Sequence, residues 1–151
     1  MKSFPFALFI LVLLVGACDN NDNEPLIYAS GQNRYTLTVE TTEREYYVHV
    51  PQGYTGNTAT PVVLMLHGTS GNGLDMYDRS GWKEVGEMEN ILTVYPSSLR
   101  YCIIDSVDGQ KNTTKWNVQP AEWVFCANET PRDDIKFLNA VLDNLDDRFN
   151  V

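Results

Sequence analysis

The pattern of hydrophobic and polar positions predicts strands of two kinds. Residues 35–39 and 46–50 alternate apolar and polar positions on either side of a polar turn. This period of two is typical of the half-buried strands of an antiparallel hairpin. Residues 62–66 are instead apolar without a break and stop abruptly at His67 and Gly68. A one-sided strand would alternate and a helix would need more length, so this run favours a central parallel strand that is buried on both faces.

The next pattern predicts a parallel crossover. A helical region covers 74–78 and 82–88, and a second apolar run at 91–95 ends at Pro96. A strand, a helix and a strand with this spacing imply a right-handed β-α-β unit. Residues 97–129 show no clear periodicity, and we expect a long loop there. A loop of this length inside a compact domain is usually functional or held by its own packing.

The last predicted element is a helix that begins near Thr130. Thr130 can cap it, Pro131 suits the first helical position, and Asp133 completes a capping-box pattern. The predicted apolar stripe of this helix consists of Ile135, Leu138, Leu142 and Leu145, widened by Val141. Asp133 and Asp134 could also form an acid/base pair of carboxylates. Capping and the helix dipole explain both residues without catalysis.

Composition narrows the classes of partner. The 151 residues suit one globular domain, with 43% hydrophobic and 21% charged residues. The net charge of −9 argues against nucleic acid and against electrostatic capture by anionic lipid. A neutral or polymeric substrate is easier to accommodate than an acidic one, and the sequence suggests no cofactor.

The N-terminus has the pattern of an export signal. Lys2 precedes an apolar stretch over 4–17 that is too short to span a bilayer as a helix. The residues that end at Cys18 resemble a bacterial lipobox, in which this cysteine carries the lipid and becomes the first mature residue. The alternatives are an ordinary signal peptide cut near Ala17 and a chance cysteine.

This pattern divides the chain into a lipoprotein signal peptide at 1–17, a polar tether at 18–33 and one domain at 34–151. The domain is expected outside the cytoplasm, either anchored to a membrane of the cell envelope by its lipid or secreted. In such an oxidising compartment Cys102 and Cys126 can form a disulfide. The alternative is two separate thiols. Two cysteines without a nearby histidine are too few ligands for a metal site.

Several short motifs in a fixed order carry a family resemblance. They are Tyr47-Val48-His49-Val50-Pro51-Gln52-Gly53-Tyr54, residues 61–68, Val94-Tyr95-Pro96, Trp116-Asn117, Cys126 and residues 133–138. With them, residues 44–151 resemble the secreted α/β-hydrolase esterases grouped around poly(3-hydroxybutyrate) depolymerases and feruloyl or acetylxylan esterases. The resemblance implies an α/β fold, an incomplete α/β-hydrolase-like sheet in which an N-terminal antiparallel hairpin is followed by parallel β-α-β units. It also implies an ester substrate, such as a plant-wall feruloyl or acetyl ester or a polyester.

The resemblance assigns roles to the loop that follows the central strand. The backbone N–H of Thr69 would bind the oxyanion of an acyl-transfer intermediate, with His67 and Gly68 supporting the loop. His67 as a general base is the less favoured alternative. The candidates for contact with the substrate are Ser70, Trp116 and Asn117. For the aromatic residues of 97–129, the alternative is that they pack this region against the sheet.

The catalytic triad of such an esterase is not contained in this sequence. No G-x-S-x-G pattern occurs in it, and in this fold the acid and the histidine follow the nucleophilic serine along the chain. We therefore expect the N-terminal part of a serine esterase, truncated before the nucleophile elbow and nearly inactive by itself, with the strand at 62–66 left as an open edge. Two alternatives remain: a short non-catalytic lipoprotein that binds polysaccharide or polyester, and a peptidase of the same fold.

Overall fold

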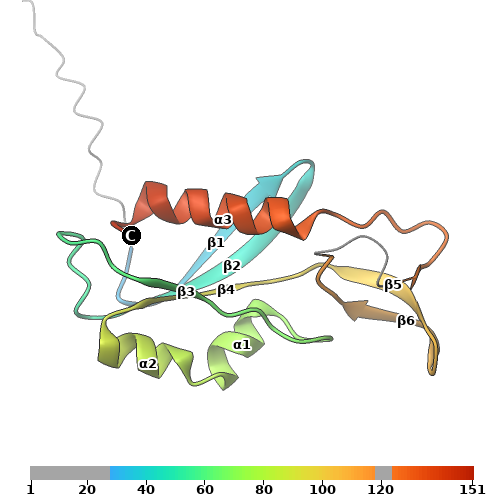
Figure 1. Ribbon diagram of the computed structural model, residues 1–151, viewed down its shortest axis with the longest axis horizontal. Helices are drawn as coiled ribbons and strands as arrows, with labels where there is room; N and C mark the ends of the chain where they lie inside the picture. The colour runs from blue at the N-terminus through green and yellow to red at the C-terminus, as the bar shows by residue number, and fades with distance from the viewer. Residues whose placement is uncertain (1–27, 118–123) are drawn as a thin grey trace, which may run out of the picture.

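The computed structural model describes residues 28–117 and 124–151 (Figure 1). The predicted signal peptide, the lipobox cysteine Cys18 and most of the tether lie outside the described residues. Within these ranges the strands form two sheets, a four-stranded sheet of order β1-β2-β4-β3 and a three-stranded sheet of order β6-β5-β7. No helix in the described part of the chain has the length and apolar character needed to cross a bilayer.

The predicted N-terminal hairpin is confirmed and is longer than predicted. Strands β1 (Gly31–Val39) and β2 (Thr42–Val50) pair antiparallel along their full length. Exposed and half-buried residues alternate in β1, as expected of a strand at the edge of a sheet. Strand β2 also pairs antiparallel with β4 (Leu92–Pro96), so its second half is buried.

The predicted parallel crossover is also confirmed. Strand β3 (Val62–Leu64) leads through helices α1 (Gly73–Arg79) and α2 (Trp82–Glu89) to β4, which pairs with β3 in parallel. The prediction that β3 is buried on both faces is wrong for the described residues. Its three residues are only half-buried, because β4 is the one strand that pairs with it there. The fully buried strand is β4.

Two helical layers cover the four-stranded sheet. Helix α3 (Asp134–Arg148) lies on one face and helices α1 and α2 lie on the other (Figure 1). Alternate residues of β2 point to opposite faces, so Tyr46 and Val48 pack under α3 while Tyr47 packs on the side of α1. The core beneath α3 consists of Tyr46, Val48, Val50, Tyr54, Leu92, Val94, Phe137, Val141, Leu145 and Phe149.

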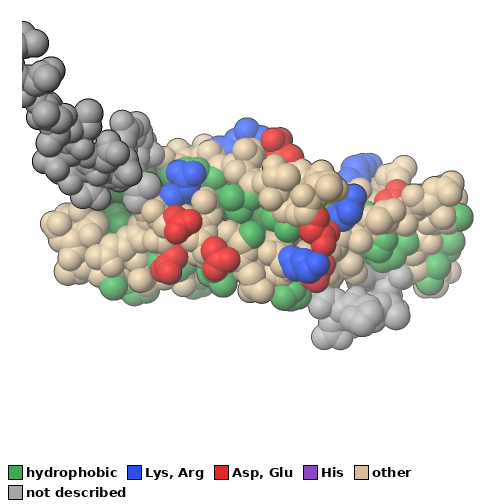
Figure 2. Space-filling model, turned by 90° about the horizontal axis from the view of Figure 1, so that it is seen from above, with side chains coloured by type: hydrophobic (Ala, Val, Ile, Leu, Met, Phe, Trp, Pro, Cys, Tyr) green, Lys and Arg blue, Asp and Glu red, His purple; other side chains and the backbone are tan. Residues whose placement is uncertain are grey.

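Helix α3 differs from its prediction in two ways. Its N-cap is Asp133, not Thr130: the Asp133 carboxylate accepts hydrogen bonds from the backbone N–H groups of Ile135 and Lys136, at 2.9 and 3.2 Å. The predicted apolar stripe is also displaced. Ile135 and Leu142 are each 46% exposed. Hydrophobic patches lie among charged side chains in the view from the α3 side of the molecule (Figure 2). The buried residues of the helix are Asp134, Phe137, Val141 and Leu145, which are three or four residues apart.

The described residues of the 97–129 region do not form the expected long loop. They contain β5 (Arg100–Asp105), β6 (Gly109–Thr114) and β7 (Val124–Phe125), which make the second sheet. Tyr101 and Ile103 face inward and are nearly fully buried. Gly109, with a φ of 70°, allows the tight turn between β5 and β6.

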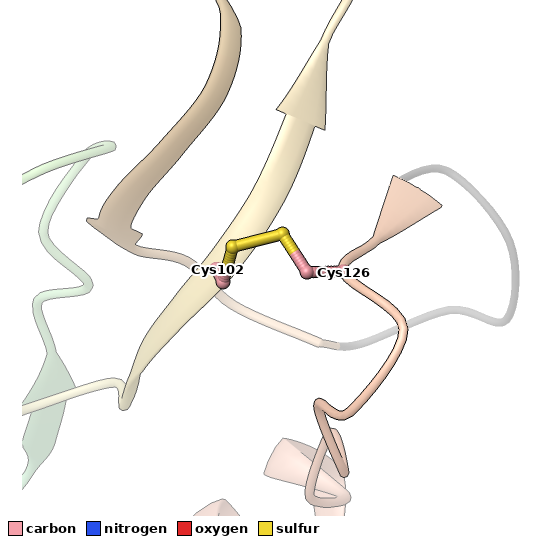
Figure 3. Close-up of a disulfide and its surroundings, with 2 residues drawn as sticks. All are labelled: Cys102 and Cys126. Atoms are coloured by element: carbon pink, nitrogen blue, oxygen red, sulfur yellow. A yellow bond between two sulfur atoms is a disulfide. The ribbon is translucent and has the colours of Figure 1, made fainter.

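A disulfide fastens this second sheet (Figure 3). Of the two alternatives for Cys102 and Cys126, the structure has the bridge, with 5.4 Å between the Cα atoms and a sequence separation of 24. Cys102 belongs to β5, and Cys126 follows β7 directly. The backbone N–H of Cys126 also donates to the carbonyl of Cys102 at 3.0 Å. The bridge therefore continues the pairing of β7 with β5.

Candidate active site

The loop after β3 is built around His67. This side chain is 4% exposed, and both of its ring nitrogens are engaged. Nε2 lies 2.9 Å from the backbone nitrogen of Ser98, which can only donate, so Nε2 is the acceptor. The proton is therefore on Nδ1, which lies 2.7 Å from the carbonyl oxygen of Gly68 and donates to it. Neither nitrogen is free to take a proton from a nucleophile, so the geometry is that of a loop support.

The orientation of one peptide unit follows from this contact. The carbonyl of Gly68 also accepts a hydrogen bond from the backbone N–H of Gly71, at 3.2 Å. This carbonyl and the N–H of Thr69 belong to the same planar trans peptide and point in opposite directions. With the carbonyl held toward His67, the Thr69 N–H points away from it. Among the described residues this N–H has no acceptor, and Thr69 is exposed.

The space beside this peptide is open. A Cβ atom built on Gly68 would meet nothing within 4 Å, whereas one on Gly71 would lie 3.3 Å from both the Gly68 carbonyl oxygen and the His67 Cβ. In open α/β sheets ligands bind outside the carboxyl ends of the strands, which is where this loop lies. An exposed, unpaired N–H at that position is a candidate donor to a developing oxyanion.

The second sheet fixes the other side of the loop. Ser70 has a φ of 67°, and its backbone N–H donates to the carbonyl of Thr114 at 3.2 Å. Its hydroxyl lies 2.6 Å from that of Thr113, and the Thr114 hydroxyl donates to the carbonyl of Gly71 at 2.6 Å. Ser70 is therefore tied to β6 by both its backbone and its side chain, and shapes the loop.

The loop ends at a close contact between α1 and β4. Asn72 caps α1 by accepting a hydrogen bond from the backbone N–H of Asp75 at 2.9 Å. Gly73 follows, and a Cβ there would lie 2.2 Å from the carbonyl oxygen of Tyr95, so only glycine fits without a shift. The Gly73 N–H also donates to the hydroxyl of Ser97 at 2.9 Å. Both ends of the loop are thus held to the sheet.

The other substrate-contact candidates are half-buried and donate hydrogen bonds to the backbone of this chain. The Trp116 indole N–H donates to the backbone carbonyl of His67 at 2.8 Å, and the two rings lie 4.9 Å apart. The Asn117 side chain donates to the carbonyl of Arg132 at 2.9 Å. The structure therefore brings Trp116 to the loop and places Asn117 at the start of α3.

A buried ion pair near the loop was not anticipated from the sequence. Arg44 and Asp134, whose side chains are 1% and 0% exposed, are joined by a contact of 2.6 Å. The same nitrogen of Arg44 donates to the carbonyl of Ser97 at 3.2 Å. The sequence held a usable signal, because Asp134 lies three and seven residues before Phe137 and Val141 and so shares their buried face. Since Asp133 caps the helix instead, the two carboxylates do not form the acid/base pair that was the alternative.

The remaining titratable groups near this region have structural contacts. Tyr101 accepts a hydrogen bond from the backbone N–H of Arg132 at 3.0 Å, and burial raises the pKa of its hydroxyl. On the opposite face of the sheet, His49 contacts Tyr77 at 3.1 Å and Glu87 at 2.9 Å, which links β2 to α1 and α2.

Within the described ranges, no three His, Cys, Asp or Glu side chains are grouped so that they could hold a metal ion.

Comparison with known proteins supports the fold. No family model and no curated protein matches the sequence. Among solved structures, an S-formylglutathione hydrolase from Agrobacterium tumefaciens matches with a TM-score of 0.57 and 15% identity, over 83% of this chain and 47% of that one. An acetyl xylan esterase from Aspergillus awamori matches with a TM-score of 0.40 and 20% identity, over 58% of this chain and 28% of that one.

The first of these likenesses establishes the class of fold. The chain has part of an α/β-hydrolase fold, a mixed sheet in which an antiparallel hairpin is followed by a parallel β-α-β unit. It spans less than half the length of either solved protein.

Proposed function

We propose that the chain is the N-terminal part of a serine-type carboxylic-ester hydrolase, in which Thr69 supplies one oxyanion contact. The observation that carries the proposal is the unpaired, exposed N–H of Thr69 at the carboxyl end of β3, beside a glycine that leaves room for a ligand. Hydrogen bonds hold the surrounding loop, so this donor needs no rearrangement when negative charge develops on a substrate oxygen.

The nucleophile, the acid and the histidine of the triad are assigned to a segment that would follow Val151. Two observations support this assignment. The outer edge of β3 is unpaired in the described residues. In addition, the backbone N–H of Thr60 donates to the carbonyl of Asn150 at 2.9 Å, two residues before β3 begins. A chain that continued from Asn150 would run beside the free edge of β3, the edge that a further strand would cover.

The substrate class follows from the same proposal. It is a carboxylic ester, with plant-wall acetyl or feruloyl esters and polyesters as the specific candidates. The net charge of −9 favours a neutral substrate over an anionic one. A non-catalytic lipoprotein that binds polysaccharide or polyester is the competing function. Trp116 and Asn117 are half-buried and donate hydrogen bonds to this chain's own backbone, which does not favour it.

The first test is the mass and the activity of the protein isolated from its source cells. We expect a mass well above 17.1 kDa after delipidation, together with hydrolysis of a short-chain chromogenic ester. A mass that matches residues 18–151 and no turnover would contradict the proposal and favour the binding lipoprotein. A sequence of the complete gene that lacks G-x-S-x-G codons would contradict it as well.

The second test removes the proposed oxyanion donor. Thr69→Pro deletes the backbone N–H, and Thr69→Ala is the matched control because it changes only the side chain. In the complete protein we expect Thr69→Pro to lower kcat by about 10² to 10³-fold, the usual effect of losing one oxyanion donor. Thr69→Ala should stay near the wild-type rate. Full activity of a folded Thr69→Pro protein would show that the oxyanion assignment is wrong.

The proposed localisation has a separate test. Cys18 is proposed to carry a lipid that anchors the domain outside the cytoplasm. Growth with a labelled fatty acid should label the wild-type protein, and Cys18→Ala should abolish the label and release the protein from the membrane fraction. An unlabelled wild-type protein would support the secreted form with an ordinary signal peptide.

A further inference from the structure

We propose that Asp134 is a positioning residue for the oxyanion loop, which it reaches through two series of contacts that meet at His67. The inference rests on the proposed function, because it concerns the same Thr69 N–H. Asp134 lies in the first turn of α3, is fully buried and does not touch the loop itself. Each of its two carboxylate oxygens begins one of the two series.

The first series runs through Arg44. One oxygen of Asp134 lies 2.6 Å from Nη2 of Arg44, and this nitrogen also donates to the carbonyl of Ser97 at 3.2 Å. The ion pair therefore holds the backbone at the end of β4. The next residue, Ser98, donates its N–H to Nε2 of His67 at 2.9 Å. Fixing Ser97 thus fixes the donor that selects the tautomer of the histidine.

The second series runs through the backbone that follows β6. The other oxygen of Asp134 accepts the N–H of Asn117 at 2.5 Å, and the Asp134 N–H donates to the Asn117 carbonyl at 3.3 Å. The preceding residue, Trp116, donates its indole N–H to the carbonyl of His67 and packs against its ring. One series therefore holds the imidazole, and the other holds the backbone of the same residue.

The two series together determine where the oxyanion donor points. With its ring fixed, His67 holds the carbonyl of Gly68, and the planar peptide then directs the Thr69 N–H to the open side. Loss of the Asp134 carboxylate would release Arg44 and Asn117 together. The Gly68–Thr69 peptide could then rotate, although neither residue touches α3.

The energetics of the ion pair also favour a positioning role. A buried ion pair is weak evidence for stability, because removing two charges from water offsets their attraction. Nε of Arg44 is buried and has no partner among the described residues, which adds a further cost. A pair of apolar side chains would join α3 to the sheet without these costs. Such a pair could not hold Ser97 and Asn117.

The test compares two charge-matched variants. Asp134→Asn and Asp133→Asn each remove one negative charge at neighbouring positions, and asparagine is as good an N-cap as aspartate. The readout is nitrogen-15 NMR of the His67 ring and of the Thr69 amide in the intact protein. We expect Asp134→Asn to convert the single His67 tautomer into a mixture and to shift the Thr69 amide. Asp133→Asn should leave both signals as in the wild type.

Kinetics in the complete protein provide a second readout. A misplaced oxyanion donor weakens transition-state binding more than substrate binding. We therefore expect Asp134→Asn to lower kcat about 10 to 100-fold with little change in KM. If the wild type hydrolyses no ester, the proposed function is wrong, and the NMR comparison still decides whether Asp134 positions the loop.

A double variant separates positioning from simple structural support. Arg44→Met combined with Asp134→Leu removes both charges, so no unpaired charge is left buried and the fold should persist. The proposal predicts the same changes at His67 and Thr69 as in Asp134→Asn. Wild-type signals at both residues in the folded double variant would overturn it, as would wild-type signals in Asp134→Asn.

Discussion

Two leucines of α3 allow a direct measurement of which helix face is buried. Leu145 is 1% exposed and Leu142 is 46% exposed, although both belong to the stripe predicted from the sequence. Replacing leucine by alanine removes three carbons, or about 2.4 kcal/mol at about 0.8 kcal/mol for each buried CH₂. At Leu145 a cavity adds to this loss, so Leu145→Ala should cost about 2–5 kcal/mol. Leu142 is about half exposed, so its truncation loses about half of this transfer free energy and leaves no cavity. We therefore expect Leu142→Ala to cost about 1 kcal/mol of unfolding free energy.

The assay is equilibrium unfolding in urea, monitored by far-UV circular dichroism, on the wild type and both variants. The two substitutions are chemically identical and lie three residues apart in one helix, so helix propensity contributes equally to both. We expect the free energy of unfolding to fall by at least about 1 kcal/mol more for Leu145→Ala than for Leu142→Ala. Equal losses would refute the assignment of the buried face to Phe137, Val141 and Leu145. A larger loss at Leu142 would refute this assignment as well.

Three further predictions concern the scaffold. Replacing Cys102 and Cys126 by alanine opens a loop with a sequence separation of 24, which in the chain-entropy model should cost about 3.5 kcal/mol of unfolding free energy in a urea titration; an unchanged midpoint would contradict it. Hydrogen bonds, led by one from a backbone N–H of the β5–β6 turn, lower the pKa of Asp105 from 3.8 to about 2. The ionised Asp105 carboxylate should therefore stabilise the hairpin fully above pH 3.8, and this stabilisation should be lost toward pH 2. The loss would be measured as faster amide exchange in β5 and β6. Asp105→Asn should abolish this pH dependence. Gly73→Ala should cost about 1–3 kcal/mol by thermal unfolding because its Cβ meets a carbonyl oxygen of β4, whereas Gly68→Ala should be nearly neutral.

The sequence predicted the elements with strong local patterns. Alternation identified the hairpin of β1 and β2, and the apolar runs and the helical region between them identified the parallel crossover from β3 to β4. The second sheet was missed because β6 is largely polar and β7 has only two residues. The run Gly109–Thr114 contains no large apolar residue, so no periodicity marks it as a strand. The pairing of β6 with β5 and the disulfide define it instead.

The sequence also did not determine where α3 starts or which of its faces is buried. Thr130, Pro131 and Asp133 satisfy a capping-box pattern, and the helix nevertheless begins four residues after Thr130, with Asp133 as its cap. A stripe that contains several leucines fits two adjacent faces of a helix equally well. The buried face is the one that includes Asp134, because Arg44 on β2 forms an ion pair with this carboxylate.

For the candidate site, the sequence predicted the location of the loop but not the contacts that hold it. The apolar run that ends in His67 and Gly68 was sufficient to locate the loop at the end of a strand. It did not reveal the contacts that hold the loop, because Ser98, Thr113 and Trp116 lie 31 to 49 residues away from their loop partners. Such contacts leave no periodic pattern in a single sequence.

Local patterns in the sequence were sufficient to predict the α/β class, the order of the main elements and the position of the glycine loop, because local periodicity and chain stiffness act within a few residues. Two features are visible only in the folded structure: α3 buries a carboxylate, and His67 is held through both of its ring nitrogens. These features depend on partners that folding brings together from distant parts of the chain. A buried polar group must find such a partner when it leaves water, and sequence neighbours do not specify which one it will be.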